Sequence, residues 1–264
     1  MKYSVLSKYR SELMGAAMLW VMLFHTGLDF GLSPLNWIRS AGFGGVDIFI
    51  VLSAVGLVAS LCKKEQTFGP FMARRALRIL PAYFVVMLTY TTFSILRGAA
   101  PVSALLWNST LLSYWVQAKG GFNWYISGIM LFYAITPFCF RCLKKTKHRE
   151  LLTAAGVFAG IFLYRFLIHL DVWGHLDVAY RVPVFFLGLL MGFYAWEGRK
   201  LGKKDILFWC FWSLCGLVYL AVLPRTDIPF LLPLGPLFLF TTVPLCLVIC
   251  LLFEHLPLGG LRRL

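Results

Sequence analysis

The first long apolar stretch of the chain carries a histidine and an aspartate whose types and spacing suit acid–base chemistry. His25 and Asp29 are four residues apart, so a continuous helix places them on one face. A histidine takes up or releases a proton near neutral pH, and a carboxylate can fix one ring nitrogen while the other acts as a base. The pair predicts a proton-transfer site. A neutral histidine bonded inside a helix bundle and a solvated carboxylate at a helix end are the alternatives left open.

Two arginines three residues apart form a second candidate site. Arg75 and Arg78 lie in segment 74–81, RRALRILP, and share one face of a helix. Their planar guanidinium groups suit bidentate binding of phosphate or carboxylate. The charge pattern alone favours a simpler interpretation, in which these arginines set membrane topology and contact anionic lipid.

Other ionisable residues also lie in apolar stretches, where they are costly and therefore functional candidates. Asp47 follows two glycines near one end of the second stretch, and we expect it to cap or orient that helix. Arg181 opens the sixth stretch. Cys139 and Cys142 form a CxxC pair without a second ligand pair, so we expect no metal site.

These residues are carried by a chain of 264 residues, of which 60% are hydrophobic and 14% charged. A soluble globular domain has about 45–50% apolar and about 25% charged residues, and a disordered chain has fewer apolar ones. Both classes are excluded. We predict one all-α domain over residues 1–264, a polytopic bundle of about eight transmembrane helices. The predicted spans are 13–32, 43–62, 79–96, 122–140, 151–168, 180–196, 206–223 and 230–253.

The charge distribution predicts the orientation of these spans. The chain has 25 Lys and Arg against 11 Asp and Glu, a formal net charge of +14. Most of the basic residues fall in the N-terminal segment, the loops after the second, fourth and sixth spans, and the C-terminal tail with Arg262 and Arg263. The positive-inside rule then places both termini in the cytoplasm. Because the charges are spread over short inner segments, a nucleic-acid partner is excluded.

The longest outer segment, 97–121, contains Trp107, Tyr114 and Trp115. Aromatic side chains favour the headgroup region of a bilayer. We expect an interfacial helix or a re-entrant segment here, because a ninth crossing would invert every later loop.

The order of these motifs resembles the membrane acyltransferase family 3, which includes O-acetylases of peptidoglycan, lipopolysaccharide, exopolysaccharide and Nod factors. The matching pieces are His25 at the end of the first span, segment 44–53 (GGVDIFIVLS), segment 74–81, the Trp124-Tyr125-Ile126-Ser127 motif, and segment 181–188 (RVPVFFLG). The resemblance covers nearly the whole chain and implies a multi-pass enzyme of the bacterial cytoplasmic membrane.

The resemblance also implies a reaction. An acyl group, usually acetyl, passes from cytoplasmic acyl-CoA to a hydroxyl of a glycan or similar acceptor at or beyond the outer face. Acyl-CoA is then a co-substrate, no bound cofactor is expected, and membrane lipid is the surrounding partner. By carry-over, His25 deprotonates the hydroxyl or relays the acyl group, and Arg75 and Arg78 meet the CoA phosphates. The spacing of Asp29 adds it to His25 as the second candidate catalytic residue. Residues expected to support the substrate or the site are Asp47, Trp124, Tyr125, Ser127 and Arg181.

The sequence departs from the family pattern in three places. Met14 stands where an arginine often lies eleven residues before the histidine, and Arg10, one turn further away, is the expected substitute at the acyl-CoA site. Ile129 stands where many members have glutamate. The family usually continues past a segment like 261–264, so we expect C-terminal helices to be missing. A transporter or an inactive membrane module that uses His25 and Asp29 for proton coupling is the alternative function.

Overall fold

The computed structural model describes residues 1–117, 122–222 and 237–255. Within these ranges the long elements are all α-helices, and the only strand-like pairing is an isolated bridge between Lys2 and Lys200. The prediction of an all-α fold is confirmed. The end of segment 97–121, the start of the predicted span 230–253 and the basic tail with Arg262 and Arg263 lie outside the described residues.

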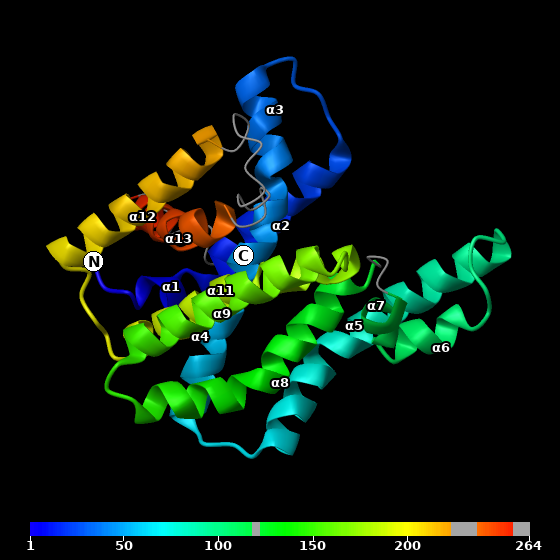
Figure 1. Ribbon diagram of the computed structural model, residues 1–264, viewed down its shortest axis with the longest axis horizontal. Helices are drawn as coiled ribbons and strands as arrows, with labels where there is room; N and C mark the ends of the chain where they lie inside the picture. Colours follow the sequence, from blue (N-terminus) through cyan, green and yellow to red (C-terminus); the bar gives the residue numbers. More distant parts are fainter. Residues whose placement is uncertain (118–121, 223–236, 256–264) are drawn as a thin grey trace. The chain divides into compact units, whose positions relative to one another are not determined.

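Six helical segments among the described residues are long and apolar enough to cross a membrane. They are Ser33–Lys63 (α3 Ser33–Ser40, η1 Ala41–Gly44 and α4 Gly45–Lys63), α5 Phe68–Leu96, α8 Trp124–Lys145, α9 Arg149–His169, Leu176–Trp196 (α10 Leu176–Ala179 and α11 Val182–Trp196) and α13 Leu237–His255 (Figure 1). Each overlaps a predicted span. The other two predicted spans are also helical, in α2 Arg10–Thr26 and α12 Lys203–Val222. The chain is therefore a multi-pass membrane protein.

The helices form two compact units. Unit 1 combines Met1–Cys62 with Pro183–Leu264, and unit 2 is the continuous stretch Lys63–Val182. Unit 1 holds α1 (Val5–Lys8), α2, α3, η1, α4, nearly all of α11, α12 and α13. Unit 2 holds α5, α6 (Ala104–Ser109), α7 (Leu112–Gln117), α8, α9, η2 (Trp173–His175) and α10.

Glycines allow α2 to lie directly against the segment that runs from η1 into α4. A Cβ atom on Gly45 would come within 2.7 Å of the Ala17 carbonyl oxygen and 2.8 Å of Val21 Cγ2. One turn earlier, a Cβ on Gly42 would overlap the Trp20 carbonyl oxygen. Helices in lipid gain stability from close van der Waals contact, which small residues permit. These two glycines therefore set the separation of α2 from its neighbour.

A second pair of glycines allows α11 to pack closely on the later turns of α4. Gly188 and Gly192 are four residues apart and share one face of α11. A Cβ on Gly188 would lie 2.8 Å from Ala54 Cβ and 2.9 Å from Val51 Cα. A Cβ on Gly192 would lie 2.7 Å from Val58 Cβ. This is the small-xxx-small arrangement of closely packed membrane helices.

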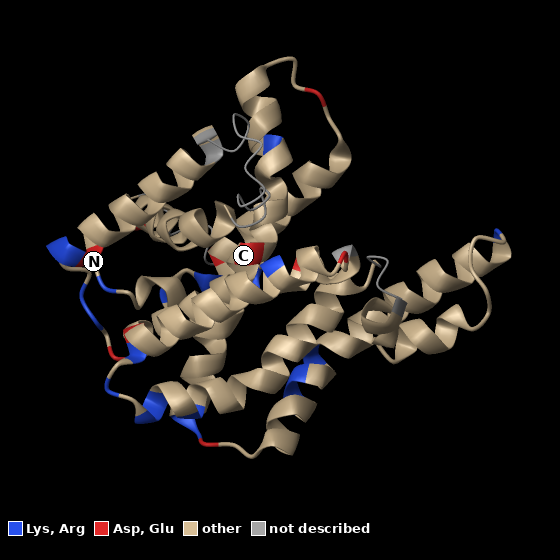
Figure 2. Ribbon diagram, in the orientation of Figure 1, with Lys and Arg blue, Asp and Glu red and all other residues tan. Residues whose placement is uncertain are grey.

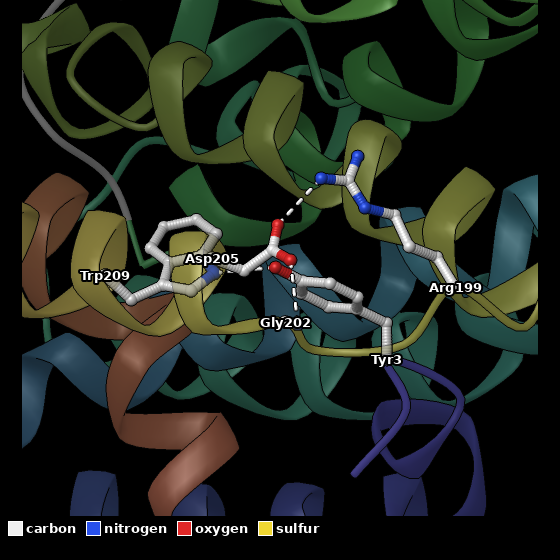
Figure 3. A network of polar contacts seen from close by, with 5 residues as sticks. All are labelled: Tyr3, Arg199, Gly202, Asp205 and Trp209. Carbon is white, nitrogen blue, oxygen red and sulfur yellow. Dashed lines mark hydrogen bonds and ion pairs between the residues drawn. The ribbon is translucent and has the colours of Figure 1, made fainter.

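The N-terminal segment is held against the connection between α11 and α12 by the polar network of Figure 3. Trp209 Nε1 donates to the Tyr3 hydroxyl at 2.9 Å, and Arg199 Nη2 lies 2.7 Å from Asp205 Oδ1. The Gly202 backbone N–H donates to Asp205 Oδ2 at 2.9 Å. Burial raises the pKa of Tyr3 to about 12, so its phenol stays neutral at physiological pH. The network joins residues about 200 positions apart in the sequence.

In unit 2, the described part of segment 97–121 folds into two short helices, α6 and α7. Each has six residues, which is too short to cross a bilayer. The Tyr83 hydroxyl on α5 donates to the Asn108 carbonyl at 2.6 Å, and Asn108 Nδ2 donates to Thr91 Oγ1 at 3.0 Å. The segment therefore packs back onto α5, and its described residues do not form a ninth crossing.

The contact between α4 and α11 leads to a prediction about stability. We expect Gly188→Ala to lower the free energy of unfolding by about 1–3 kcal/mol, because the new methyl group meets Val51 and Ala54 in a filled interface. Thermal unfolding of the purified protein in detergent, followed by tryptophan fluorescence, measures the change. Gly15→Ala is the matched control, because nothing lies within 4 Å of its added Cβ. An equal loss of stability in both variants would show that the close approach is not responsible.

Candidate functional site

His25 lies in the last turn of α2 and is exposed. Its ring packs edge-on against Phe24 with the centroids 5.0 Å apart, and Phe24 in turn contacts Phe43 of η1 at 5.7 Å. Arg10 begins the same helix fifteen residues earlier, which is about 22 Å along the axis. His25 and Arg10 are thus at opposite ends of α2.

Asp29 does not share a helix face with His25, so that prediction is wrong. α2 ends at Thr26, and Gly27 takes the left-handed conformation with φ of 66°. The Asp29 carboxylate lies in the following loop, where its Oδ1 accepts from the Gly31 backbone N–H at 2.9 Å and from Asn36 Nδ2 at 2.5 Å. These bonds lower the pKa of Asp29, the Gly31 N–H most strongly. Asp29 therefore shapes the loop that leads into α3.

Asp47 and Arg10 both contribute to the packing of α4. Asp47 lies in the first turn of α4 and is completely buried. The helix continues upstream through η1, however, so Asp47 does not cap a free helix end. Arg10 Nε donates to the Leu52 carbonyl at 3.0 Å, and the guanidinium lies against Gly56, where a Cβ would be 3.1 Å from Arg10 Cζ. Arg10 thus holds the start of α2 to the middle of α4.

Arg75 and Arg78 are the eighth and eleventh residues of α5. This helix has 29 residues and is about 43 Å long, whereas the hydrocarbon core of a bilayer is about 30 Å thick. The apolar part from Ile79 onward is alone about 27 Å long, enough for most of the crossing. A crossing that uses this apolar part therefore places the arginines at or beyond one edge of the hydrocarbon. Arg78 is exposed, and Arg75 is half-buried with its guanidinium 5.3 Å from the Phe71 ring.

Further basic residues gather at the same end of unit 2 (Figure 2). They come from the loop before α5, the last turns of α8 and the start of α9. Lys144 on α8 forms an ion pair with Glu65 of that loop at 2.6 Å, and the ion pair lowers the pKa of Glu65. Arg149 Nε donates to the Leu143 carbonyl at 2.9 Å, which ties the start of α9 to the end of α8. This end of unit 2 presents cationic groups suited to an anionic ligand.

The Trp-Tyr-x-Ser motif begins α8 and packs against the segment that contains α6 and α7. Ser127 is buried, and its Oγ donates to the Leu111 carbonyl at 3.2 Å. Asn123, directly before the motif, donates to Ser113 Oγ at 2.7 Å. Tyr125 lies on α8 between these positions. The motif therefore anchors the short helices to the bundle.

Arg181 is 2% exposed and lies between two aromatic rings. Its guanidinium carbon is 4.5 Å from the Trp124 ring centroid and 4.3 Å from that of Tyr180. Its Nη1 donates to the Asp177 carbonyl at 2.6 Å and lies 3.8 Å from the Asp177 carboxylate. A buried charge is tolerated only with such partners. Arg181 joins the start of α8 to the turn before α11.

The sequence analysis did not single out two residues of this region. His175 Nε2 lies 3.1 Å from the Tyr114 carbonyl oxygen and 3.0 Å from that of Trp115, and its ring stacks on Trp115 at 5.7 Å. Asp177 is the anionic partner of Arg181. Both lie in the short connection between α9 and α11, where an ionisable residue four positions from Arg181 was the available clue.

The candidate residues fall into two sets. Unit 1 contains His25, Asp29, Arg10 and Asp47, and unit 2 contains Arg75, Arg78, Trp124, Tyr125, Ser127 and Arg181. Within each unit the residues occupy different ends. In unit 1, His25 and Asp29 lie at the end of α2 opposite to Arg10. In unit 2, the cationic turns of α5 and the motif at the start of α8 form separate sites.

Comparison with known proteins gives one family. The model of acyltransferase family 3, described as an acyltransferase domain, matches residues 15–262. Among curated proteins, the regulator of hypoxia-inducible factor 1 of Caenorhabditis elegans is 28% identical over 184 residues, which cover 56% of this chain and 37% of that protein. The match thus spans little more than a third of that relative's length. No solved structure matches the chain.

The sandwich around Arg181 generates a prediction. We expect Arg181→Lys to lower the free energy of unfolding by about 1–3 kcal/mol. A planar guanidinium can contact two rings with its faces while its edge donates hydrogen bonds, and an ammonium group cannot do both. Thermal unfolding in detergent measures the loss. Arg97→Lys is the control, since Arg97 is exposed and its guanidinium contacts one ring, Phe93, at 4.3 Å. A change of similar size in Arg97→Lys would contradict a specific role for the buried sandwich.

Proposed function

The chain belongs to acyltransferase family 3, and on this premise we propose that it transfers an acyl group from cytoplasmic acyl-CoA to a hydroxyl of an envelope or extracellular glycan. The proposed acyl group is acetyl, and the proposed location is the cell membrane. Acyl-CoA acts as a co-substrate and leaves as CoA, so the reaction needs no bound cofactor. The observation that carries the proposal is the family match over residues 15–262, which contains every proposed site residue except Arg10.

His25 is the proposed base. Its imidazole is exposed at the end of α2, where a hydroxyl can reach it without entering the helix bundle. A base that takes the hydroxyl proton as the oxygen attacks a thioester typically accelerates the reaction by about 10²–10⁴-fold. Because Asp29 is engaged with Gly31 and Asn36, it supports the loop beside His25, and we do not propose it as a direct partner of the imidazole.

Arg75 and Arg78 are the proposed binding groups for the CoA phosphates. They lie on turns of α5 that extend beyond the apolar length of the helix, at the cationic end of unit 2. Guanidinium groups bind phosphate oxygens in a bidentate geometry, and neighbouring lysines raise the local attraction for a polyanion. Arg10 is engaged with Leu52 and Gly56, which favours a role in holding α2 and α4 together over contact with the donor.

The base assignment predicts the behaviour of a histidine variant. We expect His25→Ala to reduce O-acylation of envelope glycans by at least about 100-fold while the protein still inserts into membranes. Mass spectrometry of glycans from cells that express each variant measures the product, and immunoblots of membrane fractions measure the protein. His169→Ala is the matched control, because His169 also is exposed in the last turn of a helix, α9. Full acylation by His25→Ala would refute the assignment.

The donor assignment predicts the effect of a double substitution. We expect Arg75→Ala with Arg78→Ala to weaken binding of CoA by at least about tenfold, because two charge-assisted phosphate contacts are lost. Titration calorimetry on the purified protein measures the affinity. Lys64→Ala with Arg74→Ala removes the same charge from exposed neighbouring positions and is expected to have a much smaller effect. Equal losses in the two double variants would mean that net charge, and not a specific site, attracts CoA.

A further inference from the structure

Arg39 lies opposite the end of α2 that carries His25. α3, η1 and α4 run antiparallel to α2. Residues earlier in this segment therefore contact residues later in α2. Gly45 faces Ala17 and Val21, and Gly42 faces Trp20 and Phe24. Arg39 precedes Gly42 by three residues, about one helical turn, so it comes to the level of the last turn of α2.

Two further observations support this register. Trp20 Nε1 on α2 donates to the Ile38 carbonyl at 2.8 Å, which fixes the end of α3 beside α2. The pKa of Asp29, just beyond His25, is lowered by the Gly31 N–H, by Asn36 and, to a smaller extent, by the positive charge of Arg39. Because Asn36, about one turn before Arg39 on α3, also donates to the Asp29 carboxylate, this part of α3 lies near the chain segment that follows His25.

The Arg39 guanidinium has a hydrogen-bond donor without an acceptor among the described residues. Its Nη2 donates to Ser40 Oγ at the long distance of 3.3 Å. Its Nε is buried and has no hydrogen-bond partner in the described part of the chain. A buried donor left without an acceptor costs about 1–3 kcal/mol, so an anionic acceptor at this position is favourable. The sequence analysis did not single out Arg39.

We propose that Arg39 stabilises the oxyanion that forms when the acceptor hydroxyl attacks the acyl thioester beside His25. This inference rests on the proposed function and adds a second catalytic residue to it. Donors aimed at a developing negative charge are often the largest contribution to acyl-transfer catalysis, and more so in a partly buried site.

The reaction balances with these two residues and acyl-CoA. The hydroxyl oxygen bonds to the thioester carbonyl carbon, His25 takes the hydroxyl proton, and the carbonyl π electrons move onto the oxygen beside Arg39. When the carbonyl re-forms, the carbon–sulfur bond breaks and the sulfur leaves with the bonding electrons. The protonated His25 then gives its proton to that sulfur, which yields the ester and free CoA. Arg39 stays charged throughout and exchanges no proton.

Kinetics of the full-length protein in detergent test the inference. Acetyl-CoA is the donor probe, glycans released from the expressing cells are the acceptors, and release of the CoA thiol reports turnover. We expect Arg39→Gln to lower kcat by about 100-fold or more while the KM for acetyl-CoA changes less than about threefold. Arg39→Lys keeps the positive charge but loses the planar fork of guanidinium donors, and it is expected to retain an intermediate rate. It also serves as the informative variant if Arg39→Gln fails to fold.

The outcomes separate this inference from the proposed function. If the wild type turns over, His25→Ala does not, and both Arg39 variants keep a kcat within threefold of the wild type, the oxyanion role is overturned and the proposed function stands. A rise in KM at unchanged kcat would also overturn it, because it would mean ground-state binding. If the wild type releases no thiol above the His25→Ala background, the proposed function fails and this inference with it.

Discussion

Close contact between α4 and the two helices beside it is the constraint on which unit 1 depends. Lipid tails are as apolar as leucine side chains, so helices in a bilayer associate through packing and not through expulsion of water. Gly42 and Gly45 bring α2 against the segment entering α4, and Gly188 and Gly192 bring α11 against its later turns. The first pair also sets the register of α2 against the segment that contains Arg39. In the proposed mechanism, the same small residues therefore serve both the packing and the placement of His25 relative to Arg39.

The polar residues of unit 2 show how charge is accommodated in an apolar protein. At one end, arginines and lysines lie on turns that extend past the apolar length of α5 and α8, where water and anions can reach them. Away from that end, Arg181 is fully buried and is surrounded by Asp177, Trp124 and Tyr180. The first arrangement leaves charge available for a ligand, whereas the second uses it to hold helices together. Arginine therefore has two roles in unit 2. Where it is exposed it can bind a ligand, and where it is buried it joins helices.

The sequence predicted the helices well and the connections between them poorly. Apolar runs of about 20 residues have no alternative to helix in a membrane, so the spans followed directly from hydropathy. Leu28, Phe30 and Leu32 kept the first run apolar beyond Thr26, and the break at Gly27 was hidden among them. The helical turns of α3 were also missed, although Pro34 near their start is a usual helix signal. Because Asp29 and Arg39 lie in these connections, the misplacement of Asp29 and the omission of Arg39 have the same origin.

The division of the chain into a continuous and a discontinuous unit bears on the order of its biosynthesis. A ribosome delivers Lys63–Val182 in one piece, so every partner within unit 2 is present once residue 182 has emerged. α2 and α4 are made first, yet the packing of α4 against α11 and the hydrogen bond from Trp209 to Tyr3 require residues made much later. During that interval the face of α4 formed by Val51, Ala54 and Val58 lacks its final neighbour, so it is open to contact with a non-native helix.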